Sequence, residues 1–228
     1  MNKYLVIIPT YNEKDNIPVL AGRISNKFDI LFVDDNSPDG TALLVAEYRA
    51  KNSRIYLIER NKKMGLASAY ITGFRFALEK NYEKIIMMDA DLSHPPELLN
   101  SMVEKENDVI VGSRYIDGGA IKGWPWYRYI LSIVANYYAR FILQAPVRDL
   151  TGGFNCIKKK ALETLHLDSI EGEGYGFIIE IKYKMWKSGC SFYELPIIFK
   201  ERENGKSKIS KKIIFEAIYL VVKLRCGF

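Results

Sequence analysis

The stretch KIIMMDADLSHPP, residues 84–96, decides the fold that the sequence predicts. An apolar run from Ile85 to Met88 ends in Asp89 and Asp91, two carboxylates spaced two residues apart. Because alternate residues of a strand point to the same face, both carboxylates can converge on one point. Facing carboxylates repel each other unless a cation lies between them, and Mg²⁺ or Mn²⁺ prefers such hard oxygen ligands. The stretch therefore favours a metal–diphosphate site at the end of a sheet strand, although an isolated D-x-D also occurs as a solvated pair that caps the next helix.

Two further apolar runs end in polar clusters in the same way. They are YLVIIPTYNE, residues 4–13, and DILFVDDNSPDG, residues 29–40. In an open α/β sheet, ligands bind beyond the carboxyl ends of the strands. Three strands that each end in acids or amides at that edge therefore indicate a nucleotide site.

Apolar runs alternate with amphipathic stretches along the first half of the chain. We expect strands at 4–9, 29–34, 54–59, 84–89 and 108–113, and helices near 15–27, 40–51, 66–80 and 95–106. In the second half we expect helices at 126–143, 158–165 and 176–188, a strand FYELPIIF at 192–199, and a final basic, apolar helix. This pattern predicts an α/β fold with a mostly parallel sheet covered on both faces.

The chain of 228 residues is long enough for one large domain, residues 1–228, with a substantial core. Cys156, Cys190 and Cys226 have neither metal nor redox spacing, so we expect reduced thiols in a cytosolic protein without a signal peptide. The first strand is followed by PTYNEKDNI and not by G-x-G-x-x-G, which excludes a dinucleotide-binding dehydrogenase. A P-loop is missing as well, so side chains and a metal would have to hold a nucleotide.

Positive charge gathers at the C-terminal end. The net charge is +6, and the stretch Phe199–Phe228 carries eight Lys or Arg against three Glu. Such a basic end suggests a membrane surface, a phosphorylated lipid or, least of all, nucleic acid, for which no motif is present. The apolar run 213–224 is about half as long as a spanning helix requires, which favours an interfacial helix beside 126–143. The alternative is that both segments pack on the core.

Seven motifs, in order along the chain, resemble those of the family 2 glycosyltransferases, and most closely those of the polyprenol (dolichol) phosphate mannosyltransferase group. They are PTYNE (9–13), VDDNSPDGT (33–41), KMGLASA (63–69), MDADLSHPPE (88–97), VGSRY (111–115), DLTGGF (149–154) and ELPIIFKERENGKSKIS (194–210). The resemblance implies a GT-A (Rossmann-like) fold with C-terminal interfacial helices. It divides the chain into a nucleotide-sugar half (about 1–93), an acceptor half (about 94–210) and a basic amphipathic helix (about 208–226).

The resemblance also implies a role for individual residues. It assigns the nucleotide to Pro9, Tyr11, Glu13, Asp35, Lys63, Asp89, Ala90, Asp91 and Arg202. It assigns the metal, Mg²⁺ or Mn²⁺, to Asp89, Asp91 and Ser93, and the acceptor phosphate to Arg114, Arg128, Arg202 and Lys208. It makes Asp91, Arg114 and Arg202 the catalytic set. Ser93 stands where relatives often have Gln, so a bridging water is plausible there; His94 is expected to be structural, and Glu180 to lie near the sugar.

The activity that this resemblance implies is the inverting transfer of mannose from GDP-mannose to a polyprenyl (dolichyl) phosphate. Because the acceptor is already anionic, no general base is needed, and the product would be a β-linked mannosyl phosphate. A sister enzyme that moves glucose or another sugar from a UDP-sugar to undecaprenyl phosphate is the alternative. The intact pair Asp89 and Asp91 argues against a non-enzymatic binding subunit. We expect a peripheral protein on the cytoplasmic face of the membrane, bound to its anionic surface.

Overall fold

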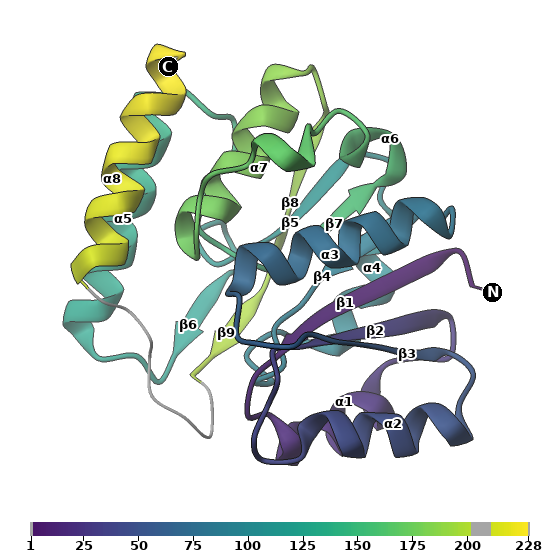
Figure 1. The fold of residues 1–228 in the computed structure, drawn as a ribbon. Coiled ribbons are helices and arrows are strands. Elements are labelled where there is room, and N and C mark those ends of the chain that lie inside the picture. Colours follow the sequence, from purple (N-terminus) through teal and green to yellow (C-terminus); the bar gives the residue numbers. More distant parts are fainter. Residues whose placement is uncertain (1, 202–210, 228) are drawn as a thin grey trace.

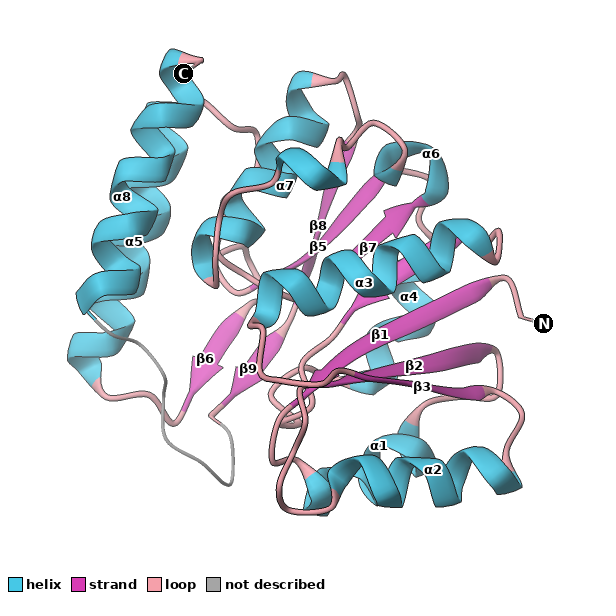
Figure 2. Cartoon of the chain, in the orientation of Figure 1, coloured by secondary structure: helices cyan, strands magenta, loops and turns pink. Residues whose placement is uncertain are grey.

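A seven-stranded sheet forms the centre of the molecule (Figures 1 and 2). The computed structural model describes residues 2–201 and 211–227, and for 211–214 the backbone alone. The strand order is β3-β2-β1-β4-β7-β5-β8. The strands are β1 (Tyr4–Thr10), β2 (Phe28–Asp34), β3 (Ile55–Glu59), β4 (Lys84–Met87), β5 (Val109–Ser113), β7 (Asn155–Lys158) and β8 (Phe192–Pro196). The sheet is mostly parallel, as the sequence predicts.

One strand of the sheet runs against the others. β7 pairs antiparallel with β4 on one side and with β5 on the other, while all other pairs in this sheet are parallel. The sequence analysis did not predict β7. The predicted strand 192–199 is in fact two strands, because the chain leaves the main sheet at Ile197. Its second part, β9 (Ile198–Lys200), pairs with β6 (Ala120–Lys122) in a separate two-stranded sheet.

Helices cover both faces of the main sheet. Against one face pack α1 (Ile17–Arg23), α2 (Thr41–Lys51) and α4 (Leu99–Glu104). Against the other pack α3 (Leu66–Glu79), α6 (Lys159–Leu162) and α7 (Tyr175–Lys187). Every residue of β2 is buried, because a strand in the middle of such a sheet has neither face in water. Short 3₁₀ turns complete the chain: η1 (Lys14–Asn16), η2 (Pro96–Leu98) and η3 (Leu167–Ser169).

Three of the predicted helices are shorter than expected, and the one predicted at 158–165 is reduced to α6, Lys159–Leu162. The helix expected at 95–106 begins at Leu99, because Pro95 is extended and Pro96 opens a 3₁₀ turn. The helix expected at 15–27 ends at Arg23, where the next residue, Ile24, turns extended and buries its side chain. In the helices predicted at 95–106 and 15–27, the local backbone conformation makes the helix shorter than its apolar periodicity predicts.

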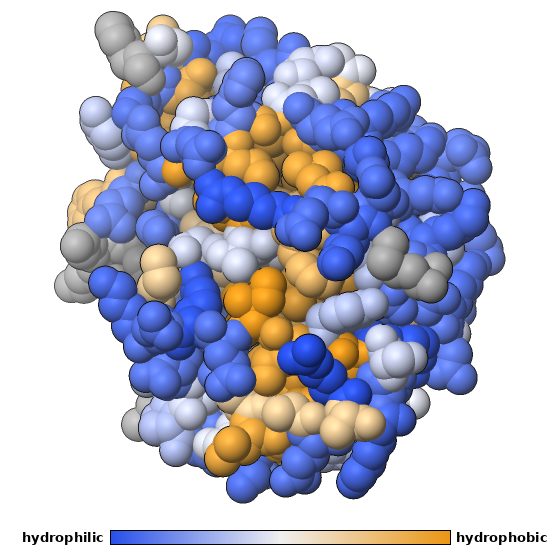
Figure 3. Space-filling view, turned by 45° about the vertical axis from the view of Figure 1, so that its right-hand side comes forward, coloured by the Kyte–Doolittle hydropathy of each residue, from blue (hydrophilic) through white to orange (hydrophobic). Residues whose placement is uncertain are grey.

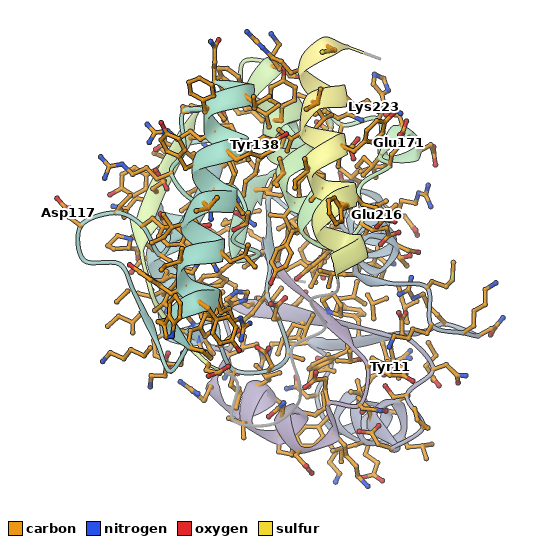
Figure 4. The ribbon with its side chains drawn as sticks, turned by 90° about the vertical axis from the view of Figure 1, so that its left-hand side faces the viewer. Tyr11, Asp117, Tyr138, Glu171, Glu216 and Lys223 are labelled. Carbon is orange, nitrogen blue, oxygen red and sulfur yellow. The ribbon has the colours of Figure 1, made fainter. Side chains whose placement is uncertain are left out.

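Two long helices stand side by side at one end of the sheet (Figures 1 and 4). They are α5 (Trp126–Leu143) and α8 (Lys211–Cys226), and the Tyr138 hydroxyl of α5 donates a hydrogen bond to the Ile218 carbonyl of α8 at 3.1 Å. Their outer faces expose large apolar side chains. These are Trp126, Tyr127, Tyr129, Ile130, Leu131, Ile133, Val134, Tyr137 and Phe141 on α5, and Phe215, Ile218, Tyr219 and Val222 on α8.

We call these exposed side chains the aromatic face. Within residues 2–201 and 211–227, no helix combines the length and the apolar character needed to cross a bilayer. A different side of the molecule, shown in Figure 3, is mostly hydrophilic, with apolar residues gathered in a strip down its middle.

Candidate active site

A cavity of about 420 Å³ opens at the carboxyl ends of β1, β2 and β4. We call it the donor cavity, after the sugar donor that the sequence predicts. Eight of the nine residues to which the sequence assigns the nucleotide line it: Pro9, Tyr11, Glu13, Asp35, Lys63, Asp89, Ala90 and Asp91. The ninth, Arg202, lies outside the described residues. The strand ends bring these side chains together because parallel strands all end at the same edge of the sheet.

Asp35 is held by the chain itself. Its Oδ2 atom accepts hydrogen bonds from the backbone N–H groups of Met64 and Gly65, both at 3.1 Å. Its other oxygen pairs with Arg60, which follows β3, and both side chains are buried. Burial lowers the pKa of the Arg60 guanidinium, and the nearby carboxylates oppose that shift. Asp35 thus fixes the loop that presents Lys63, in addition to lining the donor cavity.

Tyr11 and Lys63 form one wall of the donor cavity. The Lys63 Nζ atom lies 3.7 Å from the centre of the Tyr11 ring. An ammonium over an aromatic face is attracted by the electrons of the ring. Lys63 is thereby poised between an aromatic surface, on which a base can stack, and the carboxylates of the same cavity.

His94 holds the backbone of Asp89. The Asp89 N–H donates to His94 Nδ1 at 3.0 Å, and the imidazole stacks on Phe154 with ring centres 5.0 Å apart. Since Nδ1 accepts, it carries no proton, and the imidazole serves as a support for the loop. The Tyr70 hydroxyl lies 3.4 Å from Asp89 Oδ1, and burial together with that carboxylate raises the pKa of Tyr70.

Asp91 is oriented by its neighbour Ser93. The Ser93 hydroxyl and backbone N–H donate to Asp91 Oδ1 at 2.6 and 3.1 Å. Leu92, between them, has a φ of 61°, a left-handed conformation that costs a non-glycine residue roughly 1 kcal/mol. This left-handed conformation of Leu92, at the tip of the D-x-D loop, turns the chain so that Ser93 contacts Asp91. Ser93, which the sequence assigns to the metal, contacts Asp91 through both of these hydrogen bonds.

The donor cavity is acidic. Its described lining carries the carboxylates of Glu13, Asp35, Asp89, Asp91 and Glu173, whereas Lys63 is the one cation among those lining residues. Within the described residues there is no cluster of three or more His, Cys, Asp and Glu that could hold a metal unaided. Mg²⁺ commonly takes one or two protein carboxylates and completes its shell with substrate phosphates and water. Asp89 and Asp91 fit a cation of that kind, bound together with a diphosphate.

A buried ion pair holds the turn of residues 149–153, from which Thr151 and Gly153 line the donor cavity. Arg114, which follows β5, donates from Nε and Nη2 to the two oxygens of Asp149, both at 2.8 Å. Burial opposes both charges, but each partner outweighs it for the other, so the pKa of Arg114 is raised and that of Asp149 is lowered. Arg114 is therefore engaged inside the protein, where it holds the turn of residues 149–153.

Lys182 supports the same turn from α7. Its side chain is fully buried, and Nζ donates to the carbonyls of Asp149 and Gly152, both at 2.8 Å. Burial lowers the pKa of this ammonium to about 7, although Asp149 acts in the opposite direction. Gly153 completes the turn, and a Cβ atom there would lie 3.8 Å from Asp89 Oδ1. The turn is thus packed directly beside the D-x-D carboxylates.

A second cavity, of about 260 Å³, lies between α5 and α8. Its lining is apolar apart from Arg128, Ser132 and Thr151, and we call it the apolar groove. Arg128 stacks 4.1 Å from the centre of the Trp124 ring and pairs with Glu201 at 3.0 Å. Two residues, Thr151 and Tyr175, line both the apolar groove and the donor cavity.

Comparison with known proteins agrees with this architecture. The family model described as glycosyl transferase family 2 matches residues 5–165. The polyprenol monophosphomannose synthase of Mycolicibacterium smegmatis is 41% identical over 96% of this chain and 85% of its own length. The chain belongs to glycosyltransferase family 2.

Further relatives of this family 2 glycosyltransferase extend the comparison. The undecaprenyl-phosphate mannosyltransferase of Micrococcus luteus is 38% identical over 97% of this chain and 93% of its own length. A mannosyltransferase from Pyrobaculum calidifontis, solved in complex with GDP-Man and Mn²⁺, superposes with a TM-score of 0.59 at 18% identity. That superposition covers 99% of this chain and 73% of the other. The fold predicted from the sequence is confirmed.

Some predicted site residues of the glycosyltransferase are placed elsewhere or not at all. Arg202 and Lys208 lie outside the described residues. Glu180 does not belong to the described lining of the donor cavity; its Oε2 atom accepts the N–H groups of Glu171 and Gly172 at 3.1 and 2.7 Å. These hydrogen bonds hold the loop just before Glu173, whose side chain does line the cavity.

Sequence reasoning missed three residues that shape the site of the glycosyltransferase. Arg60 directly follows the third strand of the sheet, so its position after the run IYLIE was a usable signal. Lys182 and Asn136 carried no such signal. Each is a polar residue on the inner face of a helix, and only the packed structure shows that both meet the turn at 149–153.

Proposed function

We propose that this protein transfers mannose from GDP-mannose to a polyprenyl phosphate with inversion at the sugar carbon. One observation carries the proposal: the acidic donor cavity and the apolar groove meet at Thr151 and Tyr175. A nucleotide sugar and an isoprenoid chain need such different surroundings, polar for one and apolar for the other. The curated relatives named above act on isoprenoid phosphates, which agrees with the join between the two cavities.

For the donor, we assign the nucleoside to the wall formed by Pro9, Tyr11, Glu13, Asp35 and Lys63. The Tyr11 ring offers a stacking surface, and Lys63 Nζ beside it offers a charge to the first phosphate. The sugar would then extend toward Glu173 and Tyr175, next to the apolar groove. GDP-mannose bound to the Pyrobaculum mannosyltransferase agrees with a donor of this class.

We assign Mg²⁺ or Mn²⁺ to Asp89 and Asp91, with Ser93 keeping Asp91 in position. Bound there, the cation would neutralise the charge that develops on the departing diphosphate. The acidic lining supports the assignment, because a cation would offset the repulsion between these carboxylates and a bound diphosphate.

The acceptor brings its own nucleophile. A phosphate oxygen of the polyprenyl phosphate forms the new bond to the sugar carbon as the bond from that carbon to the diphosphate breaks. No proton has to move, and the described lining of neither cavity contains a histidine. Arg128 at the polar end of the apolar groove, together with Arg202 and Lys208, is assigned to the acceptor phosphate. Arg114 would contribute mainly by holding the 149–153 turn beside the reacting groups, which is preorganisation.

The aromatic face gives this reaction a location. Tyr137 and Phe141 stack on each other with ring centres 6.3 Å apart and expose most of their surface. Aromatic side chains of this kind are suited to the interface between lipid head groups and acyl chains. We assign the protein to the cytoplasmic face of a membrane as a peripheral protein, with the apolar groove turned to the bilayer that holds its acceptor.

The deciding experiment pairs a donor panel with a short polyprenyl phosphate. GDP-mannose, GDP-glucose, UDP-glucose and UDP-galactose are each incubated with the full chain, Mn²⁺ and the acceptor, and the lipid product is analysed by mass and by anomeric configuration. We expect a β-linked mannosyl phosphate from GDP-mannose. Preferential transfer from a UDP-sugar would establish the sister activity instead, and failure of every donor would reject an isoprenoid phosphate as the acceptor.

A further inference from the structure

Thr151 occupies the join between the two cavities. It lies on the 149–153 turn just before β7, its side chain is almost completely buried, and it lines both the donor cavity and the apolar groove. A group that reaches from one cavity to the other must pass this side chain. The hydrogen-bonding capacity of Thr151 therefore bears directly on what can be bound at the join.

The Thr151 hydroxyl oxygen accepts two hydrogen bonds from within the protein. Asn136 Nδ2 donates to it at 2.9 Å, and Arg114 Nη2 donates to it at 2.9 Å. A guanidinium can only donate. The orientation of the Asn136 amide is fixed as well, because its Oδ1 accepts the Thr151 backbone N–H at 3.1 Å and its Nδ2 also donates to the Ser132 carbonyl at 2.9 Å.

A hydroxyl has two acceptor sites and one proton. Both acceptor sites of Thr151 are used, so its proton must point to a third partner, and among the described residues no acceptor receives it. Since a buried polar hydrogen without a partner is costly, the join calls for a ligand oxygen. Resting on the function proposed above, we propose that the Thr151 hydroxyl donates a hydrogen bond to an oxygen of the acceptor phosphate.

The same arrangement makes Thr151 selective for an anion. The positive guanidinium on its oxygen polarises the O–H bond and strengthens it as a donor. With both lone pairs engaged, this hydroxyl cannot take a proton from an incoming alcohol or water. The join thus favours an acceptor that arrives already deprotonated, and a phosphate monoester is such a group, whereas a neutral alcohol is not.

Two kinds of variant test the direction of the hydrogen bond. Thr151→Val removes the hydroxyl at constant volume, while Thr151→Ser keeps it. Asn136→Asp keeps Thr151 itself but replaces the amide donor by an acceptor, so the Thr151 proton turns toward the new carboxylate and away from the join. Asn136→Ala removes the amide and leaves the proton available. Thr164→Val is the control: it removes a half-buried hydroxyl that donates to the Ala161 carbonyl at 2.8 Å, and Thr164 lines neither cavity.

The readout is kcat/KM for a short polyprenyl phosphate at saturating GDP-mannose, together with donor affinity by calorimetry. A hydrogen bond to a charged group corresponds to a loss of about tenfold to a hundredfold, which we expect for Thr151→Val and for Asn136→Asp. The kcat/KM should fall less in Thr151→Ser than in Thr151→Val, and less in Asn136→Ala than in Asn136→Asp. The double variant Thr151→Val with Asn136→Asp should be no worse than either single one, because both remove the same bond. Donor affinity and the control variant should stay at the level of the unchanged chain.

Each contrary outcome has one meaning. Unchanged acceptor kinetics in Thr151→Val would overturn the proposal while leaving the function intact. An equal fall in Asn136→Ala and Asn136→Asp would reduce Asn136 to a structural support and overturn the directional argument. A loss of donor affinity equal to the loss in kcat/KM would assign the hydrogen bond to the donor diphosphate. If the unchanged chain transfers no sugar to any polyprenyl phosphate, the proposed function fails and this inference fails with it.

Discussion

At the scale of single residues, some carboxylates in and near the donor cavity have a cationic partner within the protein. Asp35 is paired with Arg60, and Asp149 with Arg114. Asp91 accepts hydrogen bonds from the hydroxyl and the backbone N–H of Ser93. The roles proposed for these carboxylates, structural for Asp35 and Asp149 and metal-binding for Asp91, can be tested one residue at a time.

We expect Asp91→Asn to lower kcat for mannosyl transfer by at least about 10²-fold, because an amide cannot anchor a cation against the diphosphate. Turnover is measured with GDP-mannose across a Mn²⁺ titration. Asp117→Asn is the control, since Asp117 is exposed on the loop after β5 and points into solvent (Figure 4). Turnover of Asp91→Asn near that of the control, or full activity of the unchanged chain in excess EDTA, would contradict the metal assignment.

Asp149→Asn should destabilise the fold as well as the site. The substitution leaves the Arg114 guanidinium buried without its counter-charge, for which a loss of about 3 kcal/mol in the free energy of unfolding is expected. Urea unfolding at pH 7 measures it. Because Arg114 holds the pKa of Asp149 low despite its burial, the contribution is present above the unfolded pKa and disappears as the pH falls through the folded one. A loss below about 1 kcal/mol at pH 7 would argue that the pair is dispensable.

At the scale of elements, α5 has an inner face that contacts the candidate site and an outer face that is exposed. Its inner face carries Asn136, which contacts the 149–153 turn, and its outer face carries stacked aromatic rings. One helix therefore connects the proposed membrane contact to the join between the cavities.

We expect Tyr137→Glu combined with Phe141→Glu to reduce binding to anionic vesicles by at least about tenfold, since burial of each aromatic side chain contributes roughly 1.5–3 kcal/mol. Co-sedimentation with phosphatidylcholine–phosphatidylglycerol vesicles measures the binding. Leu43→Glu is the matched control, because Leu43 is a similarly exposed apolar residue on α2, outside the aromatic face. Transfer to a short acceptor in detergent should remain. If the double variant binds vesicles as the control does, the aromatic face is not the membrane contact.

Asp108, just before β5, contributes to the free energy of unfolding by an amount that varies with pH. Asp108 Oδ2 accepts the Ser191 hydroxyl and backbone N–H, both at 2.9 Å, and pairs with Lys160 at 2.7 Å. Burial works against the charged form, but these donors outweigh it and lower the pKa of Asp108 to about 2. Its stabilisation is therefore complete above the unfolded value of about 4 and is lost as the pH falls from about 4 to 2.

Asp108→Asn should accordingly lower the free energy of unfolding by roughly 1–2 kcal/mol at pH 7. The difference from the unchanged chain should shrink as the pH approaches 3. Urea unfolding at pH 7, 5 and 3 provides the comparison. A deficit that is the same at all three values would mean that shape, and not charge, makes Asp108 important.

At the scale of the whole molecule, ligand binding should stabilise the fold. A nucleotide present at 100 times its Kd adds about 2.7 kcal/mol, which raises the Tm of a chain of this size by about 5–10 °C. We expect GDP with Mn²⁺ to produce such a shift, and GDP with EDTA, or Mn²⁺ alone, to produce little. UDP with Mn²⁺ tests the base. A larger shift with UDP than with GDP would favour the sister activity, and an equal shift with EDTA would contradict metal-assisted binding.

The sequence predicted the strand ends well because their apolar runs are long and stop abruptly. The helix predicted at 126–143 agrees with α5, Trp126–Leu143, since its periodicity is sustained over five turns. The strand NCIK of β7 was missed, because a four-residue run after a glycine turn has no distinctive period. The pairing of Arg114 with Asp149 was beyond prediction for another reason: it depends on two loops that meet only in the folded molecule.

The antiparallel strand β7 also has a consequence for the order in which the chain can fold. As synthesis proceeds from the N-terminus, β1 to β4 can assemble into a parallel sheet, but β4 must wait for β7, which is made much later. Until then β4 is an open edge with unpaired backbone groups, a template for pairing with other chains. A ribosome-bound fragment that ends before residue 150 should therefore depend on chaperones, and that dependence should fall once residues 155–158 have emerged.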